Sequence, residues 1–301
     1  MSALLFFLNT NYTNLTNYMN DELQRKVDRA IKLLQSAEVM AKKVGQPVEI
    51  CYSGGKDSDV ILELAKMSGI DFKGIYKNTT IDPPGTIKHA REMGCEVMQP
   101  EMNFQEIIAD KGMPNRWRRF CCKFLKEYKV LDYAVVGIRR DESRARKERY
   151  HEPEVCRVYS KDVKARQYLP ILDWTERDVA EFLTERGVKC HPLYYDESGT
   201  FHAERRLGCM CCPLMSRRKR VESFKEHPQM VRFYINGAQK YLDRHPDSKI
   251  GKLFNWNVYD WLTSQIFCDG ERQFRQQFGA TMFDDGIDTK QFLEQQFNIK
   301  L

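Results

Sequence analysis

Short apolar runs alternate with amphipathic stretches through the first half of the chain. Short apolar runs favour buried strands, and apolar residues spaced three or four apart favour helices. The expected strands lie near residues 48–52, 71–77, 95–98 and 132–136. The expected helices lie near residues 20–43, 56–67, 86–93, 103–110 and 117–129. This alternation predicts an α/β fold, a parallel sheet with helices on both faces.

The pattern changes after Ile138. Residues 139–168 are charged and have little periodicity, so we interpret them as a long functional loop. Thr175 is the expected N-cap of a helix over 176–186. Residues 190–215 are loop-like and rich in cysteine, and the chain reads as helical from Arg217 onward.

Three units follow from these changes in pattern. Residues 1–46 are an irregular arm followed by a helix that Asn20 caps, and residues 47–215 are the α/β domain. Residues 216–301 are a helical extension at the carboxyl end.

The stretch from Cys51 to Ser58 joins the first strand to the following helix. Its glycines, Gly54 and Gly55, permit a sharp turn and close approach of a ligand to the backbone. The helix that starts here presents free N–H groups and the positive end of its dipole, which bind phosphate. Hydroxyl donors from Ser53 and Ser58 add to this. We interpret the stretch as a nucleotide-phosphate loop rather than a turn that merely needs small residues.

Five cysteines fall into two tight groups, Cys121-Cys122 and Cys209-Met-Cys-Cys212. Cys121, Cys122, Cys209 and Cys212 supply four thiolates, which suit either a tetrahedral zinc ion or a 4Fe–4S cluster. Spacing alone leaves these two open, and Cys211 is then a bystander. Buried free cysteines are the alternative without metal.

The chain of 301 residues has a formal net charge of +6 and a pI near 8.7. This charge suits polyanionic nucleotides and is compatible with nucleic acid. No apolar run approaches the roughly 20 residues of a membrane span, and the run Leu4–Leu8 follows no basic residue as a secretory signal would. We therefore expect a cytoplasmic protein with no membrane contact and with reduced cysteines.

Further candidates flank the expected sheet. Asn78 and Thr79 follow the second strand, where open α/β sheets bind ligands, although a turn before Pro83 explains them equally well. Arg139 and Arg140 follow the last expected strand and could clamp a phosphate. Other basic residues lie beside the cysteines and could either follow a nucleic-acid backbone or offset an anionic centre. They are Arg116, Arg118, Arg119, Lys123, Lys126 and Arg217–Arg220.

Trp117 stands among these basic residues. It could stack on a base, as could Tyr194 and Tyr195, but packing in the core or at an interface is the commoner use of each.

These motifs, in this order, resemble the phosphoadenylyl/adenylyl sulfate reductase family. The loop Ser53–Ser58 is similar to the S-G-G-x-D-S pyrophosphate loop of adenine-nucleotide α-hydrolase-like proteins, and the C-C…C-x-x-C set resembles members with a 4Fe–4S cluster. Gly137-Ile-Arg-Arg-Asp-Glu-Ser143 with Arg146 resembles the G-x-R-x-x-x-S-x-x-R loop of that family. Further similar segments are Leu169–Val179, His191–Tyr194 and Lys126, and the resemblance covers about residues 46–215.

The chain also departs from sulfate reductases. Asn78–Pro84 stands where they carry D-T-G…P-E-T, and no E-C-G-x-H segment supplies their reductive cysteine. Cys268 lies in Phe-Cys-Asp-Gly, which differs from that segment. The chain is more similar to the ATP-pyrophosphatase subunit of DNA phosphorothioation systems, or to reductase-like members found in mobile elements.

The resemblance implies an enzyme that binds ATP or a related adenine nucleotide, cleaves its α–β bond and couples this to sulfur transfer onto an acceptor. Alternatives are a sulfonucleotide reductase with an external thiol and a non-catalytic nucleotide sensor or assembly subunit. Nucleic acid as acceptor, a sulfur-donor protein and Mg²⁺ are further implied partners. The residues implied in catalysis are Lys56, Asp57, Lys126 and Arg139. Those implied in nucleotide binding are Ser53, Gly54, Gly55, Lys56, Asp57, Ser58, Asn78, Thr79, Gly137 and Arg139.

Overall fold

A six-stranded sheet forms the centre of the protein in a computed structural model that describes residues 20–159, 164–279 and 286–301. Its strand order is β3-β2-β1-β4-β6-β5. All neighbours are parallel except β5 and β6, which are antiparallel. The strands are β1 (Val48–Tyr52), β2 (Phe72–Lys77), β3 (Glu96–Met98), β4 (Tyr133–Val135), β5 (Glu154–Val158) and β6 (Lys164–Tyr168). The predicted α/β fold with a mostly parallel sheet is confirmed. The arm expected over residues 1–19 lies outside the described residues.

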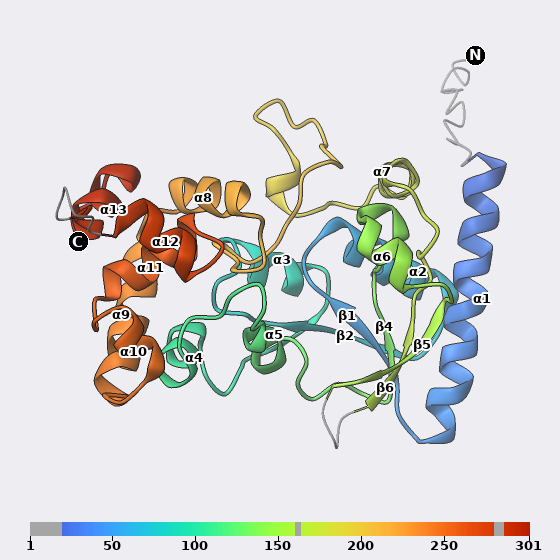
Figure 1. Ribbon diagram of the computed structural model, residues 1–301. Helices are drawn as coiled ribbons and strands as arrows, with labels where there is room; N and C mark the ends of the chain where they lie inside the picture. The colour runs from blue at the N-terminus through green and yellow to red at the C-terminus, as the bar shows by residue number, and fades with distance from the viewer. Residues whose placement is uncertain (1–19, 160–163, 280–285) are drawn as a thin grey trace, which may run out of the picture.

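One face of the sheet packs against α1 (Asp21–Lys43), α2 (Lys56–Ser68) and α7 (Glu176–Glu185) (Figure 1). Apolar side chains of α1 recur at helical spacing, and Leu23, Val27 and Leu34 are fully buried in this first core. The side chain of Asn20 accepts hydrogen bonds from the N–H groups of Glu22 and Leu23, so it caps α1 as predicted.

Side chains alternate between the two faces along each strand, so every second residue of β1 points to the opposite face of the sheet. Val48, Ile50 and Tyr52 belong to the first core, so Glu49 and Cys51 of the same strand point the other way. Glu49 and Cys51 line a cavity there, together with Lys77 of β2 and Gln167 of β6.

Residues 139–168 are more ordered than the predicted loop. They contain η1 (Arg140–Glu142), α6 (Arg144–Arg149) and the antiparallel strands β5 and β6. The prediction of a long loop was wrong because both strands are charged, with polar side chains standing between small or apolar ones. Residues 160–163 lie outside the described residues.

The helix expected over residues 117–129 is shorter in the structure. It begins at Phe120 and ends at Leu125 as α5. The remaining early elements follow the predicted ranges closely, as α3 (Thr86–Glu92) and α4 (Phe104–Lys111).

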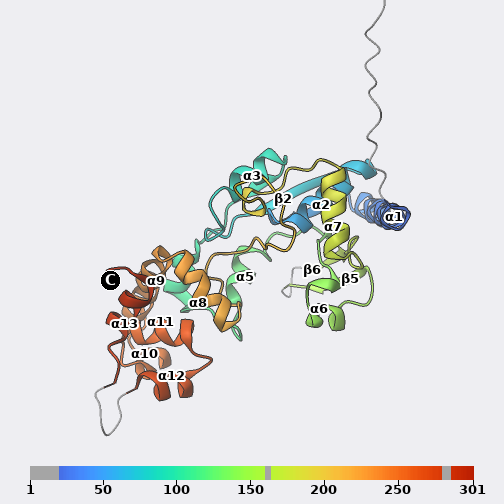
Figure 2. The same cartoon turned by 90° about the horizontal axis from the view of Figure 1, so that it is seen from above.

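The carboxyl-terminal helices gather at the opposite end of the molecule from α1 (Figures 1 and 2). They are α8 (Arg217–Glu226), α9 (Gln229–Arg244), α10 (Lys249–Leu253), α11 (Val258–Phe267), α12 (Glu271–Phe278) and α13 (Thr289–Phe297). Their apolar faces form a second core that includes Phe104 and Ile108 of α4 and Leu125 of α5. The extension therefore shares a core with the α/β part, and the boundaries of the three expected units stay a prediction. Within the described ranges, every helix is too short or too polar to cross a bilayer.

The burial of α1 predicts its contribution to stability. Leu34 is fully buried, whereas Val39 of the same helix is 56% exposed. Leu34→Ala removes a buried side chain and is expected to lower the free energy of unfolding by about 2–5 kcal/mol. Val39→Ala is the matched control, expected within about 0.5 kcal/mol of the parent. Urea unfolding followed by circular dichroism measures both, and equal midpoints for the two variants would contradict the packing of α1.

Candidate functional site

The turn from β1 to α2 depends on glycine at position 54. Gly54 has a φ of +79°, in the left-handed region that side chains disfavour. A Cβ atom there would lie 2.7 Å from Cγ2 of Thr86 and 3.1 Å from Cδ2 of Leu207. Neighbouring side chains thus pack closely around the backbone of the turn and fix its position.

Gly55 is the N-cap of α2 and brings the two serines together. Its carbonyl accepts hydrogen bonds from the N–H of Ser58 at 2.8 Å and from the Ser58 hydroxyl at 2.6 Å. The hydroxyls of Ser53 and Ser58 are 3.3 Å apart. The turn thus joins two hydroxyls to the first N–H groups of a helix, the arrangement that binds phosphate.

The side chain of Asp57 is held by Arg139. Nε of Arg139 donates to Oδ1 of Asp57 at 2.6 Å, and the buried arginine is only 1% exposed. Nη1 of Arg139 lies 3.4 Å from the carbonyl of Trp174. A Cβ atom on Gly137 would stand 2.9 Å from the carbonyl oxygen of Asp57, so this glycine permits the close approach of the two segments. Arg139 and Asp57 line the cavity as a pair.

Lys56 is buried beside Tyr194. Its Nζ lies 3.8 Å from Oδ2 of Asp57 and 5.8 Å from the centre of the Tyr194 ring. The hydroxyl oxygen of Tyr194 accepts hydrogen bonds from the N–H groups of Lys56 at 3.2 Å and Leu207 at 3.3 Å. This oxygen therefore occupies the start of α2, where an oxygen of a bound anion is expected. Tyr194 is buried, as packing in the core requires, and its contact with the start of α2 could not be predicted from the sequence.

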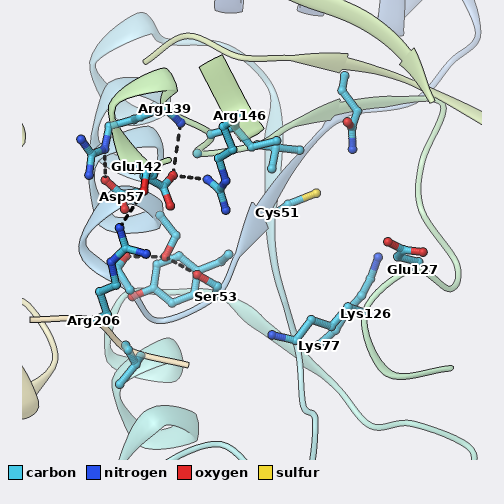
Figure 3. Close-up of a pocket in the computed structure, with 18 of the residues that line it drawn as sticks. Cys51, Ser53, Asp57, Lys77, Lys126, Glu127, Arg139, Glu142, Arg146 and Arg206 are labelled. Carbon is cyan, nitrogen blue, oxygen red and sulfur yellow. Dashed lines mark hydrogen bonds and ion pairs between the residues drawn. The ribbon is translucent and has the colours of Figure 1, made fainter. Parts of the chain in front are cut away.

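A cavity of about 1000 Å³ joins the loop to the open face of the sheet. Ten lysines and arginines line it against five carboxylates. Figure 3 shows Ser53, Asp57, Arg139 and Arg206 on one side, with Lys77, Lys126 and Glu127 on the other. An excess of positive charge in a concave site favours an anionic ligand.

A buried ion pair forms part of the cavity floor. Nζ of Lys77 lies 3.0 Å from Oε1 of Glu49, whose side chain is fully buried. Oε2 of Glu49 accepts the N–H of Leu131 at 2.7 Å, so both carboxylate oxygens have partners. Sequence reasoning missed this pair because an acidic residue in a strand of the sheet is unexpected. The signal in the sequence was the position of Lys77 at the carboxyl end of β2, because open α/β sheets bind their ligands at the carboxyl ends of strands.

Asn78 and Thr79 form a turn instead of lining the cavity. Oδ1 of Asn78 accepts the N–H of Thr80 at 2.8 Å, and the N–H of Thr79 donates to Oδ2 of Asp82 at 3.2 Å. The turn interpretation accounts for both residues. Thr79 also reaches the cysteine region, because its hydroxyl lies 3.5 Å from Sγ of Cys209.

The basic residues of 139–149 separate into two groups. Arg146 pairs with Glu142 and lines the cavity, whereas Arg140 binds Asp173 and the carbonyl of Tyr150 away from it. Arg157 of β5 and Arg206 also line the cavity, and sequence reasoning missed both. No alternation marked Arg157, because the polar residues of 154–158, Glu154 and Arg157, stand three positions apart.

The structure brings the four candidate cysteines to one region around Lys126. Cys121 and Cys122 lie on α5, and Cys209 and Cys212 precede α8. The pKa of Lys126 is raised, first by the thiol of Cys209 and also by Asp82 and the thiols of Cys122 and Cys212. Lys126 is exposed, and its side chain lines the cavity. In the described segments, no three His, Cys, Asp or Glu side chains are closed around a single metal position. The donor set itself, four thiols with a neighbouring cation, fits an iron–sulfur cluster in its chemistry.

The chain is similar in sequence to several known proteins. An uncharacterized protein of Methanocaldococcus jannaschii is 30% identical over 222 residues, covering 68% of this chain and 44% of that protein. A second protein of that organism is covered to 54%, so the chain spans about half the length of these relatives. Sulfate adenylyltransferase subunit 2 of Shewanella baltica is 25% identical, covering 68% of this chain and 78% of the relative.

A solved structure, the U34-tRNA thiolase of Methanococcus maripaludis with its [4Fe–4S] cluster, is 17% identical. It matches with a TM-score of 0.38 and covers 75% of this chain and 82% of that one. Residues 47–215, more than half of the chain, match the phosphoadenosine phosphosulfate reductase domain. With its glycine loop, basic cavity and mostly parallel sheet within those residues, the chain belongs to the phosphoadenosine phosphosulfate reductase domain family.

Proposed function

We propose that the protein binds ATP, cleaves its α–β bond to adenylylate an acceptor, and couples this step to sulfur transfer. The observation that carries the proposal is the single cavity shared by the glycine loop, an excess of basic side chains and Lys126 of the cysteine region. Its volume of about 1000 Å³ is large enough for a nucleotide together with a second reactant.

In this proposal, Ser53, Gly54, Gly55 and Ser58 bind the phosphates through N–H groups and hydroxyls. The N–H of Lys56 is released from the Tyr194 hydroxyl when a phosphate oxygen takes its place. Catalysis then consists of positioning and of stabilising the charge that develops on the phosphates.

Charged groups at the loop would complete the nucleotide site. Lys56 supplies a cation, Arg139 orients Asp57, and Asp57 offers a carboxylate to Mg²⁺. Gly137 lets the strand end approach the loop. Asn78 and Thr79 shape the turn beside the nucleotide.

The proposed cofactor is a 4Fe–4S cluster held by Cys121, Cys122, Cys209 and Cys212. Such a cluster supplies electron-transfer or sulfur chemistry when it is bound. Zinc is the lesser alternative, since four thiolates also suit it. Lys126 would offset the negative charge of the thiolates. A sulfur-donor protein and an acceptor would be the further partners.

Product analysis tests the proposed reaction. Purified protein with ATP and Mg²⁺ is expected to release AMP and pyrophosphate, with water taking the place of the acceptor at the α-phosphorus. Lys56→Met is expected to slow release by about 100-fold because a phosphate contact is lost. Lys66→Ala, on the exposed side of the same helix, is the matched control. Sulfite released from adenylyl sulfate or phosphoadenylyl sulfate would instead support a reductase. Tight ATP binding without turnover would support a sensor.

The crowding at Gly54 gives a second prediction. Gly54→Ala places a Cβ atom against Thr86 and is expected to weaken ATP binding at least tenfold, because the turn must move. Gly69→Ala has the same left-handed backbone but open space around it, so ATP affinity should not change. Adding Thr86→Ser to Gly54→Ala removes the clashing methyl and should restore part of the affinity. Isothermal titration calorimetry measures each value, and equal losses in the two alanine variants would refute the steric argument.

Metal analysis of anaerobically purified protein tests the cofactor. About four irons and four sulfides per chain are expected, with a large loss in Cys121→Ser and in Cys209→Ser. Cys156→Ser is the control, because Cys156 is exposed and outside the cysteine region. One zinc without sulfide would exclude the cluster but leave the nucleotide site untouched.

A further inference from the structure

A tight turn just before α5 displays a tryptophan to solvent. The backbones of Asn115 and Arg118 exchange two hydrogen bonds, at 3.2 and 3.1 Å. Oδ1 of Asn115 also accepts the N–H groups of Trp117 at 3.0 Å and Arg118 at 2.9 Å. Trp117 therefore stands at the tip of a turn that its neighbours hold, with 88% of its surface exposed. Trp117 thus does not pack in the core, and of the expected uses, packing at an interface and stacking on a base stay predictions.

The surroundings of Trp117 are strongly basic. Arg116, Arg118 and Arg119 adjoin it in sequence and are exposed, as is Lys123 on α5. No acidic residue interrupts residues 112–126. An exposed aromatic ring between arginines is the combination that binds single-stranded nucleic acid, because every base has a face to stack and every linkage carries a negative charge.

The first turn of α8 adds to the same surface. Arg217, Arg218 and Lys219 are exposed there, and Arg218 pairs with Glu222 at 2.9 Å. Arg220 is buried and anchors the turn through the carbonyls of Ile266 and Met215. Leu214, three residues before α8, lines the same cavity as Arg116 and Arg119, so the turn of Trp117 and the start of α8 both border this cavity.

The turn also adjoins the cavity. Arg116 and Arg119, on either side of Trp117, line the cavity wall. A strand stacked on Trp117 would thus follow a continuous run of positive charge to the cavity mouth.

We propose that the Trp117 turn and the first turn of α8 form a docking surface for single-stranded nucleic acid. This inference stands apart from the proposed reaction, because binding requires no turnover of ATP. Charge favours a polyanion as the occupant: residues 112–126 carry five basic side chains and no acidic one, which matches the repeated negative charge of a phosphate backbone.

Fluorescence anisotropy with a labelled single-stranded oligonucleotide, as DNA and as RNA, tests the surface. Trp117→Ala is expected to weaken binding about 5- to 150-fold, since one stacked base is lost, whereas Trp117→Phe should retain most of the affinity. Arg218→Ala should lower the slope of log K against log salt by about 0.7, as expected for one phosphate contact. Thermal unfolding should be unchanged in Trp117→Ala, because the side chain is exposed.

Matched controls come from the far helices. Arg275 on α12 pairs with Glu271 at 2.8 Å, as Arg218 pairs with Glu222, so Arg275→Ala should leave binding and its salt slope unchanged. Equal affinity of the parent and Trp117→Ala would overturn the proposal, as would equal losses in Arg218→Ala and Arg275→Ala. If the parent binds no oligonucleotide and Trp117→Ala dissociates a dimer in light scattering, the surface is a protein interface and the proposal is wrong.

Discussion

The ion pair between buried Arg139 and partly exposed Asp57 is the constraint on which the site depends. It links the first turn of α2 to the segment that follows β4, and these two segments flank the turn at Gly54. An arginine buried to this degree without a partner would cost several kcal/mol, so the pair holds the two segments together. Gly137 makes the contact possible, because any side chain there would collide with the carbonyl of Asp57. The loop is thus rigid before a ligand arrives, which reduces the entropy lost on binding.

The same sheet that carries the loop also carries charge on its open face. Glu49 and Lys77 belong to the adjacent strands β1 and β2, and their pairing keeps two ionised groups beneath the cavity without a net charge. Several wall groups are also paired with carboxylates, as Arg139 and Arg146 are. Among the described residues, those that line the cavity without an ion pair and are left to act on a ligand are Arg116, Arg119, Lys126, Arg149 and Arg206. This division separates charges that stabilise the fold from charges that would bind a phosphate.

The sequence was a good guide wherever local chemistry decides the structure. The glycine turn, the cap at Asn20 and the strands from β1 to β4 follow from residue types and spacing. The strands β5 and β6 were missed because their stability comes from pairing with a neighbouring strand, which periodicity does not report. The pairing of Arg139 with Asp57 joins residues 82 positions apart, and the exposure of Trp117 depends on a turn that no apolar pattern marks. Contacts of this kind require the folded chain.

The helices after residue 215 lie outside the matched family domain, yet they hold the cysteine loop in place. The N–H of Cys211 donates to Oγ of Ser223 on α8, and the hydroxyl of Tyr234 on α9 donates to the Cys211 carbonyl at 2.9 Å. Cys211 adopts a φ of +51°, a strained conformation that these two bonds help to hold. Because α9 also packs on α4 in the second core, the loop between Cys209 and Cys212 is held against the α/β part from both sides. Truncating the extension would remove this support. The extension therefore stabilises the cysteine region, although none of its residues is a candidate ligand.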